Sequence, residues 1–86
     1  MRPAAPSSAV VMARVRAAYL ASSLSYAEIG ARMGYKDRRL GKEKAYQFVN
    51  LVRQPSAVKL ARFALAVGVP IATLLARPRS PEPVTR

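Results

Sequence analysis

The segment from Leu24 to Gly34 carries signals for both ends of one short helix, and it constrains the fold more than any other feature. Ser25 and Glu28 have the S-x-x-E spacing of a capping box, in which each side chain accepts a hydrogen bond from the other residue's backbone N–H. Leu24 before the cap and Ile29 at the fourth helical position have the spacing of a hydrophobic staple. Gly34 stands where a glycine commonly takes the left-handed turn after a helix.

Apolar residues recur at helical spacing elsewhere in the chain, and no useful length alternates with the period of two that indicates a strand. Ser7 or Ser8 can cap a first helix, and Ser56 can cap a fourth helix after Pro55 stops the third. The sequence therefore predicts an all-α, five-helix domain. The predicted inward residues are Val11, Val15, Ala18, Tyr19 and Ser22 in the first helix; Ala45, Phe48, Val49 and Val52 in a third helix from about Gly41 to Gln54; Leu60, Phe63, Ala64 and Val67 in a fourth that ends at Gly68; and Ile71, Leu74 and Leu75 in a fifth from Pro70 to Ala76.

Composition and length limit the domain organisation and the chemistry. Residues 1–6 and 77–86 are Pro-rich and lack apolar periodicity, so we expect a flexible N-terminal arm, a helical domain over 7–76 and a flexible C-terminal tail. The chain has no Cys and no His, which leaves no ordinary zinc site and removes the commonest general base. No convincing catalytic constellation remains, so we expect neither an enzyme nor a cofactor.

The charge is strongly positive, with 15 Lys and Arg against 4 Asp and Glu and a net charge of +11. Such a field attracts nucleic acid or an anionic membrane without specifying either. No apolar run approaches the roughly 20 residues of a membrane span, and the first residues lack the features of a secretory signal. We therefore expect a soluble, cytoplasmic protein.

The third predicted helix has side chains that can recognise base edges in the major groove of DNA. Lys42 can donate to guanine O6 and N7, Glu43 can accept from cytosine N4, and Gln47 can pair with adenine N6 and N7. Tyr46 completes this set of candidate base-reading residues, although its spacing also fits the edge of the core, like that of Tyr19. Glu43 could equally pair with a neighbouring cation. For Gln47, a direct base contact and no base contact are equal alternatives.

The region from about Val15 to Ala76 resembles the lambda-repressor-like helix-turn-helix family, the Xre/Cro group of bacterial and phage DNA-binding proteins. Aligned on Ala45 in the buried aliphatic position, Lys42, Glu43 and Gln47 fall on the family's usual base-reading positions. The resemblance implies a compact five-helix fold whose third helix enters the major groove of double-stranded DNA.

The sequence departs from the family pattern in three places. About five extra residues lie between Gly34 and Gly41, compared with the usual tight turn. Leu51 replaces the glycine that normally ends the third helix, so we expect that helix to run further, and Pro70 replaces the usual cap of the fifth. One alternative is that Asp37 caps a third helix that begins near Arg38, which would extend the reading helix by a turn.

Basic or polar residues in and around the second and third helices are candidates for phosphate contacts. Tyr26 takes the first position of the second helix, where the resemblance implies phosphate binding and where its hydroxyl and N–H could serve. The alternative for Lys36, Arg38 and Arg39 is a solvated basic loop. The candidates are Tyr26, Lys36, Arg38, Arg39, Lys44, Asn50 and Arg53.

These expectations favour a sequence-specific transcriptional regulator that binds double-stranded DNA, with repression as the first interpretation. The resemblance suggests a homodimer on a palindromic site, and Leu65, Leu74 and Leu75 could supply its apolar contact, although core packing explains them equally well. One alternative is an antitoxin or phage-type accessory protein that binds DNA and a protein partner. Another is a sequence-neutral nucleoid or RNA binder that uses charge alone.

Overall fold

Five α-helices and no strand make up residues 6–76, the part of the chain that the computed structural model describes. The predicted all-α, five-helix architecture is confirmed for these residues, whereas the predicted tail and all but the last residue of the predicted arm lie outside them. Within this range no helix is long and apolar enough to cross a membrane. The helices are α1 (Ser8–Ser22), α2 (Tyr26–Arg32), α3 (Arg38–Val49), α4 (Ala57–Val67) and α5 (Ile71–Leu75).

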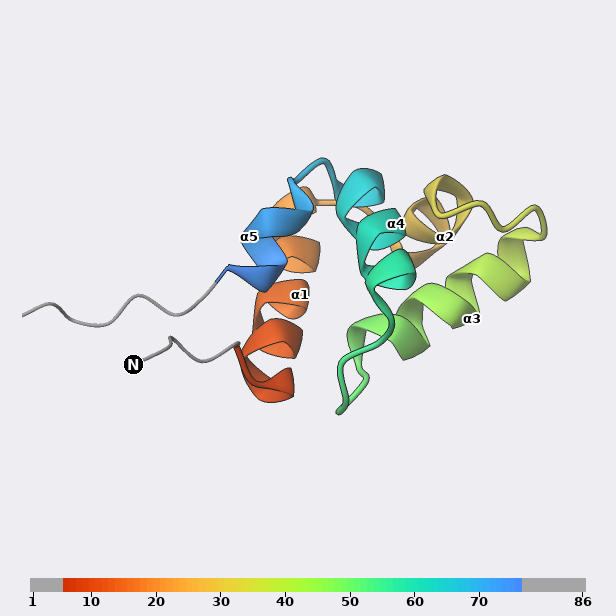
Figure 1. Cartoon of the computed structure of the whole chain (residues 1–86). Coiled ribbons are helices and arrows are strands. Elements are labelled where there is room, and N and C mark those ends of the chain that lie inside the picture. The colour runs from red at the N-terminus through yellow and green to blue at the C-terminus, as the bar shows by residue number, and fades with distance from the viewer. Residues whose placement is uncertain (1–5, 77–86) are drawn as a thin grey trace, which may run out of the picture.

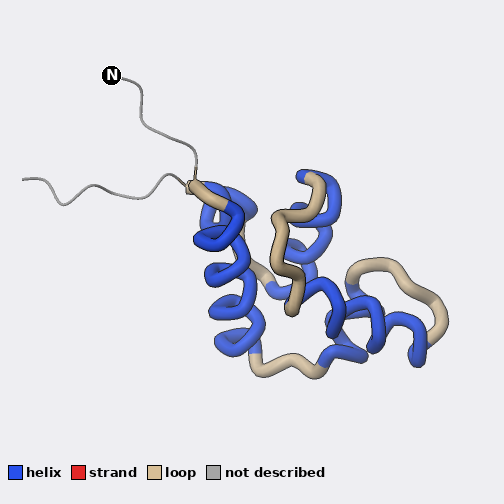
Figure 2. The backbone as a smooth tube through the Cα atoms, turned by 90° about the horizontal axis from the view of Figure 1, so that it is seen from below, coloured by secondary structure: helices blue, strands red, loops and turns tan. Residues whose placement is uncertain are grey.

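The helices form two groups, α1 with α5 and α2 with α3, and α4 contacts both. In Figure 1, α1 and α5 lie side by side at one end, α4 occupies the middle, and α2 and α3 form the other end. α2 packs mainly on α3, and α1 contacts α3, α4 and α5. In Figure 2 the connection between α3 and α4 crosses the face of the domain that is turned toward the viewer. This arrangement leaves the N-terminal end of α3 projecting from the body of the domain.

Side-chain caps explain where four of the five helices begin. Ser7, Ser25, Asp37 and Ser56 each accept a hydrogen bond from a backbone N–H in the first turn of the helix that follows. These bonds satisfy donors that have no partner inside the helix. Pro70 precedes α5 and gives it no side-chain cap. The caps predicted at Ser25 and Ser56 are confirmed, and of the two residues predicted as possible caps of α1, Ser7 and Ser8, the cap is Ser7.

Both predicted ends of α2 are present. The Ser25 hydroxyl accepts from the Glu28 N–H at 3.1 Å, and the Glu28 carboxylate accepts from the Ser25 N–H at 3.0 Å. After the helix, Gly34 has a φ of 106°, and the N–H groups of Gly34 and Tyr35 donate to the carbonyls of Ala31 and Gly30, which is the Schellman pattern. The helix is only seven residues long, so these end contacts matter to its stability.

We expect Ser25→Ala to lower the free energy of unfolding by about 0.5–2 kcal/mol, because an N–H at the start of α2 loses its acceptor. Chemical denaturation followed by circular dichroism measures this difference. Ser8→Ala is the comparison, because Ser8 is exposed in the first turn of α1 and is not its cap. An unchanged midpoint for Ser25→Ala would mean that the capping box contributes nothing.

The capping box should also make stability depend on pH. The hydrogen bond from the Ser25 N–H holds the pKa of the Glu28 carboxyl below its usual value, with smaller contributions from Arg32 and Arg38. A lowered pKa stabilises the folded state above the unfolded-state pKa of about 4.3, and the effect is lost as pH falls through the folded-state value. We therefore expect Glu28→Gln to melt below wild type at neutral pH and to approach it in acid. A difference that stayed constant with pH would contradict this linkage.

The core lies where α1, α3 and α4 meet, and α2 and α5 close it. The Phe48 and Phe63 rings stack at its centre with ring centroids 5.1 Å apart. Most predicted inward residues are buried, and Met12 and Ala66 join them although they lie outside the predicted stripes. The buried cluster is Val11, Met12, Val15, Ile29, Ala45, Phe48, Val49, Leu60, Phe63, Ala64, Ala66 and Leu74.

The start of α3 differs from the first prediction and agrees with its alternative. Asp37 accepts a backbone hydrogen bond in the first turn at 3.0 Å, so the helix begins at Arg38 rather than near Gly41. Of the five residues that looked like an insertion, Arg38, Arg39 and Leu40 belong to the first turn of the helix, Asp37 caps it and Lys36 stays in the connection. Only Gly34–Lys36 separate the caps of the two helices. The connection is therefore short.

The predicted end of α3 is wrong, because the helix stops at Val49 and not at Gln54. The side-chain amide and backbone N–H of Asn50 both donate to the Tyr46 carbonyl, at 2.8 and 3.2 Å. An Asn that bonds the nearby backbone competes with continuation of the helix. Val52, predicted to face the core, is 85% exposed in the loop.

A close contact between two glycines fixes α2 against α3. A Cβ atom added to Gly30 would lie 2.3 Å from the carbonyl oxygen of Gly41, and both residues are buried. A Cβ added to Gly41 would meet the Tyr35 Cβ at 3.2 Å. The two helix backbones therefore approach more closely than any side chain on α2 would allow at this point. The contact therefore sets the distance between α2 and α3 at this point.

Candidate nucleic-acid interface

The outer face of α3 is a row of exposed side chains opposite the core. Arg39, Glu43, Tyr46 and Asn50 follow one another at helical spacing, and all four are exposed. The opposite face carries Gly41, Ala45, Phe48 and Val49, which are buried. One side of α3 thus anchors the helix while the other presents one basic, one acidic and two polar side chains to a partner.

The two strongest base-reading candidates lie on opposite edges of this face. Lys42 and Gln47 are five residues apart and so project from α3 in different directions, and both are exposed. Gln47 lines a groove against α4, which Lys42 does not. The predicted residues Lys42, Glu43, Tyr46 and Gln47 are therefore on one accessible surface, but they do not form a tight cluster.

The N-terminal end of α3 is basic, as the alternative with Asp37 as the cap implied. Arg38 and Arg39, predicted as part of a loop, are exposed in the first helical turn, and Lys36 is exposed just before Asp37. A helix of this length spans about 18 Å, whereas the major groove is about 12 Å wide. The N-terminal end of α3 carries Arg39, whereas Gln47 lies in its last turn.

Tyr26 serves mainly to join three helices. Its ring stacks on Tyr19 of α1 with centroids 4.6 Å apart and meets Tyr46 of α3 edge-on at 5.3 Å. The neighbouring Tyr26 phenol and partial burial raise the pKa of the Tyr19 phenol above its usual value. Tyr26 is half-buried and Tyr46 is 55% exposed, so the cluster reaches the surface at the outer face of α3.

The other predicted phosphate contacts are exposed but have different settings. Lys44 lies on the side of α3 that faces α4, and Arg53 lies in the loop between those helices. Asn50 uses one amide N–H to close α3, which leaves its other N–H and its oxygen for a partner. Two further arginines are structural. Arg14 donates to the carbonyls of Leu74 and Ala76 at the C-terminal end of α5. Arg32 donates to the carbonyl of Ala66 at the C-terminal end of α4.

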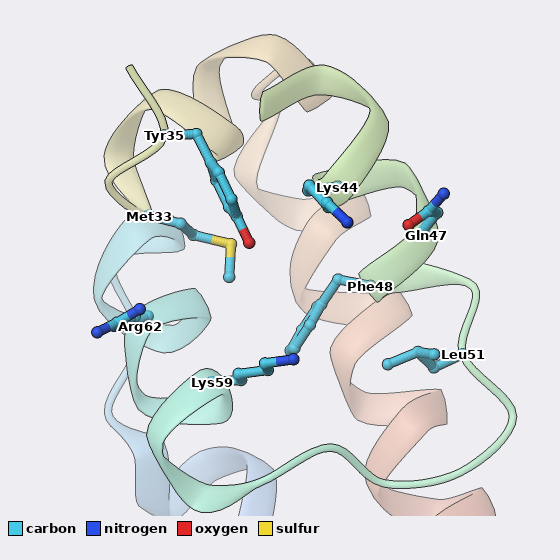
Figure 3. Close-up of a pocket in the computed structure, with 8 residues that line it drawn as sticks. All are labelled: Met33, Tyr35, Lys44, Gln47, Phe48, Leu51, Lys59 and Arg62. Atoms are coloured by element: carbon cyan, nitrogen blue, oxygen red, sulfur yellow. The ribbon is translucent and has the colours of Figure 1, made fainter. Parts of the chain in front are cut away.

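A groove between α3 and α4 was not foreseen from the sequence. It holds about 190 Å³ and has an apolar floor with cationic walls (Figure 3). Lys44 projects from α3 and Lys59 from α4, with Phe48 between them. The spacing of Lys59 and Arg62 on one face of α4 was a signal, but only the packing of α4 on α3 makes it a site. The lining residues are Met33, Tyr35, Lys44, Gln47, Phe48, Leu51, Lys59 and Arg62.

The apolar patch suggested for a dimer is not formed as expected. Leu74 is fully buried and belongs to the core, whereas Leu65 is 81% exposed on α4. Leu75 is half-buried and packs against the core. Of the three residues, only Leu65 is free to contact a second molecule in the described part of the chain.

Comparisons with protein-family models, with curated proteins and with solved structures found no match for this chain. Within residues 6–76 no group of three His, Cys, Asp or Glu side chains could hold a metal ion. Function is therefore inferred from the geometry and charge of α2, α3 and α4.

Proposed function

We propose that this protein is a sequence-specific double-stranded DNA-binding regulator, a repressor in the simplest form, that inserts α3 into the major groove. The observation that carries the proposal is the two-sided character of α3: one face is buried in the core and the other is exposed and polar. A short connection and the close contact of Gly30 with Gly41 hold this helix to α2, which supports its assignment as a helix-turn-helix of the lambda-repressor-like kind. Binding would occlude the operator from other proteins.

The contacts we propose follow from the position of each side chain along α3. Arg39 and Lys42, near the N-terminal end, would donate to guanine O6 and N7, and Glu43 would accept from cytosine N4. Tyr46 and Gln47 would reach bases further along the groove. Arg39 thus joins the base-reading candidates because it lies on the outer face of the first turn rather than in a loop.

The surrounding cations would hold the two phosphate strands. Lys36 and Arg38 lie beside the projecting end of α3, and Arg53 lies beyond its other end. Lys44 is on the flank that faces α4. Such contacts set affinity and orientation but carry no direct base information.

We expect the double change Arg38→Ala and Arg39→Ala to make the plot of log K against log salt shallower, by about 0.9 for each phosphate that an arginine no longer neutralises. The measurement is a fluorescence anisotropy titration of a labelled duplex at several salt concentrations. Since only Arg38 of the two is proposed to bind a phosphate, the slope should change by about 0.9 in total, and the loss of Arg39 should lower the preference between duplexes at one position.

Arg16→Ala is the matched control, because Arg16 is an exposed arginine on α1, outside the proposed interface. It should leave the salt slope unchanged. An equal slope for wild type and the double variant would return both arginines to the role of solvated side chains. If wild type bound all duplexes equally well, the result would support a sequence-neutral binder.

A further inference from the structure

The groove between α3 and α4 has the chemistry of a small-ligand site. Met33, Phe48 and Leu51 provide apolar surface, and the Tyr35 hydroxyl can donate a hydrogen bond. Its volume of about 190 Å³ is below the roughly 300–1,000 Å³ of pockets for drug-sized molecules, so it suits a compact ligand of one or two rings.

The groove has cations on both walls and no carboxylate among its lining residues. Lys44 comes from α3, and Lys59 and Arg62 come from α4 (Figure 3). The three acidic residues in the described part of the chain are engaged or placed elsewhere. Glu28 and Asp37 cap helices, and Glu43 lies on the outer face of α3. The positive field in the groove is therefore not balanced by an acidic group that lines it.

We propose that this groove binds a small amphipathic anion, in which a carboxylate or sulfonate is attached to a compact aromatic body. The body would cover the floor formed by Phe48 and Met33, and the anionic group would lie between Lys44, Lys59 and Arg62. Burial of the aromatic body favours binding but does not orient the ligand. The cations orient it, because they bind the anionic group. A ligand with only one of these two features would bind less tightly.

Occupation of the groove would also regulate the surface proposed to bind DNA, and this part rests on the proposed function. Lys44 and Gln47 line the groove and belong to α3. A bound anion would neutralise positive charge at the edge of that helix and repel phosphates. By linkage, the ligand and DNA would weaken each other's binding by the same factor.

Isothermal titration calorimetry with 2-naphthoate tests the site in the absence of DNA. Its controls are 2-naphthalenemethanol, which keeps the rings without the charge, and acetate, which keeps the charge without the rings. We expect the dissociation constant for 2-naphthoate to be at least about tenfold lower than for either control. Equal affinity for 2-naphthoate and the neutral alcohol would overturn the proposal.

Variants locate the binding. The double change Lys59→Gln and Arg62→Gln alters exposed side chains and should weaken 2-naphthoate binding about tenfold, with the fold checked by circular dichroism. Leu51→Glu, which places a carboxylate at the floor, should weaken it as well, and Arg16→Gln on α1 should not. Wild-type affinity in both groove variants would place the ligand elsewhere and overturn the proposal.

The regulatory part is tested by repeating the duplex titration with saturating 2-naphthoate and with acetate at the same ionic strength. We expect 2-naphthoate, but not acetate, to weaken DNA binding by the wild type severalfold. In the groove variants 2-naphthoate should have no such effect. If saturating 2-naphthoate left DNA binding unchanged, the proposed competition between the ligand and DNA would be wrong. If the protein binds no duplex at all, the proposed function fails, while the calorimetry still decides whether the groove binds anions.

Discussion

Phe48→Ala is expected to lower the free energy of unfolding by about 3–5 kcal/mol. Phe48 is 6% exposed and stacks on Phe63 with ring centroids 5.1 Å apart, so its removal leaves a cavity between α3 and α4. It also removes the largest anchor of α3. Urea denaturation followed by circular dichroism measures the loss, and a domain of this size could be largely unfolded by it.

Val52→Ala is the matched comparison, because the sequence assigned both residues to one inward stripe. Val52 is 85% exposed, and its truncation should change stability by no more than about 0.5 kcal/mol. Phe48→Leu should fall between the two, since it keeps part of the buried surface. Similar losses for Phe48→Ala and Val52→Ala would contradict the facing of α3 described above.

Gly30→Ala is expected to lower the free energy of unfolding by about 3 kcal/mol, at the upper end of overpacking costs. The new Cβ would lie 2.3 Å from the Gly41 carbonyl oxygen, a backbone atom that cannot rotate away. On an open helix the same change would stabilise by about 1 kcal/mol, so the close contact must reverse the sign. Thermal and urea denaturation both report the change.

Gly41→Ala is the natural control, because it makes the same substitution on the other side of the contact. Its Cβ would meet the Tyr35 Cβ at 3.2 Å, which a small backbone shift of the connection that carries Tyr35 would relieve, and helix propensity offsets part of the cost. We expect its stability to lie within about 1 kcal/mol of wild type. If Gly30→Ala proved as stable as Gly41→Ala, the backbones of α2 and α3 would not be in contact.

The helices could be predicted where local chemistry decides the outcome. Ser25, Glu28 and Gly34 act on backbone groups within a few residues, and the structure forms both helix ends where the sequence placed them. The limits of α3 were harder, because Asp37 and Asn50 each had more than one role open to them. Asp37 became a cap and extended the helix at its start, whereas Asn50 closed it five residues earlier than the apolar spacing indicated.

The candidate site could be predicted as a set of residues but not as a surface. Helical spacing placed Lys42, Glu43 and Gln47 outside the core, and they are exposed. It could not show that Arg14 would bond the last carbonyls of α5, nor that Lys59 would face Lys44 across a groove. Both depend on how helices distant in sequence pack, which local patterns do not contain.

Selection of bound sequences from a random duplex pool, with wild type and Arg39→Ala in parallel, tests the central proposal most directly. Wild type should enrich one short motif, and two half-sites, if present, should be centred about 10–10.5 base pairs apart or a multiple of that. Arg39→Ala should recover the same motif with preference lost at one position, whose wild-type base pair contains guanine. A bound pool with the composition of the starting pool would contradict sequence-specific recognition by this protein.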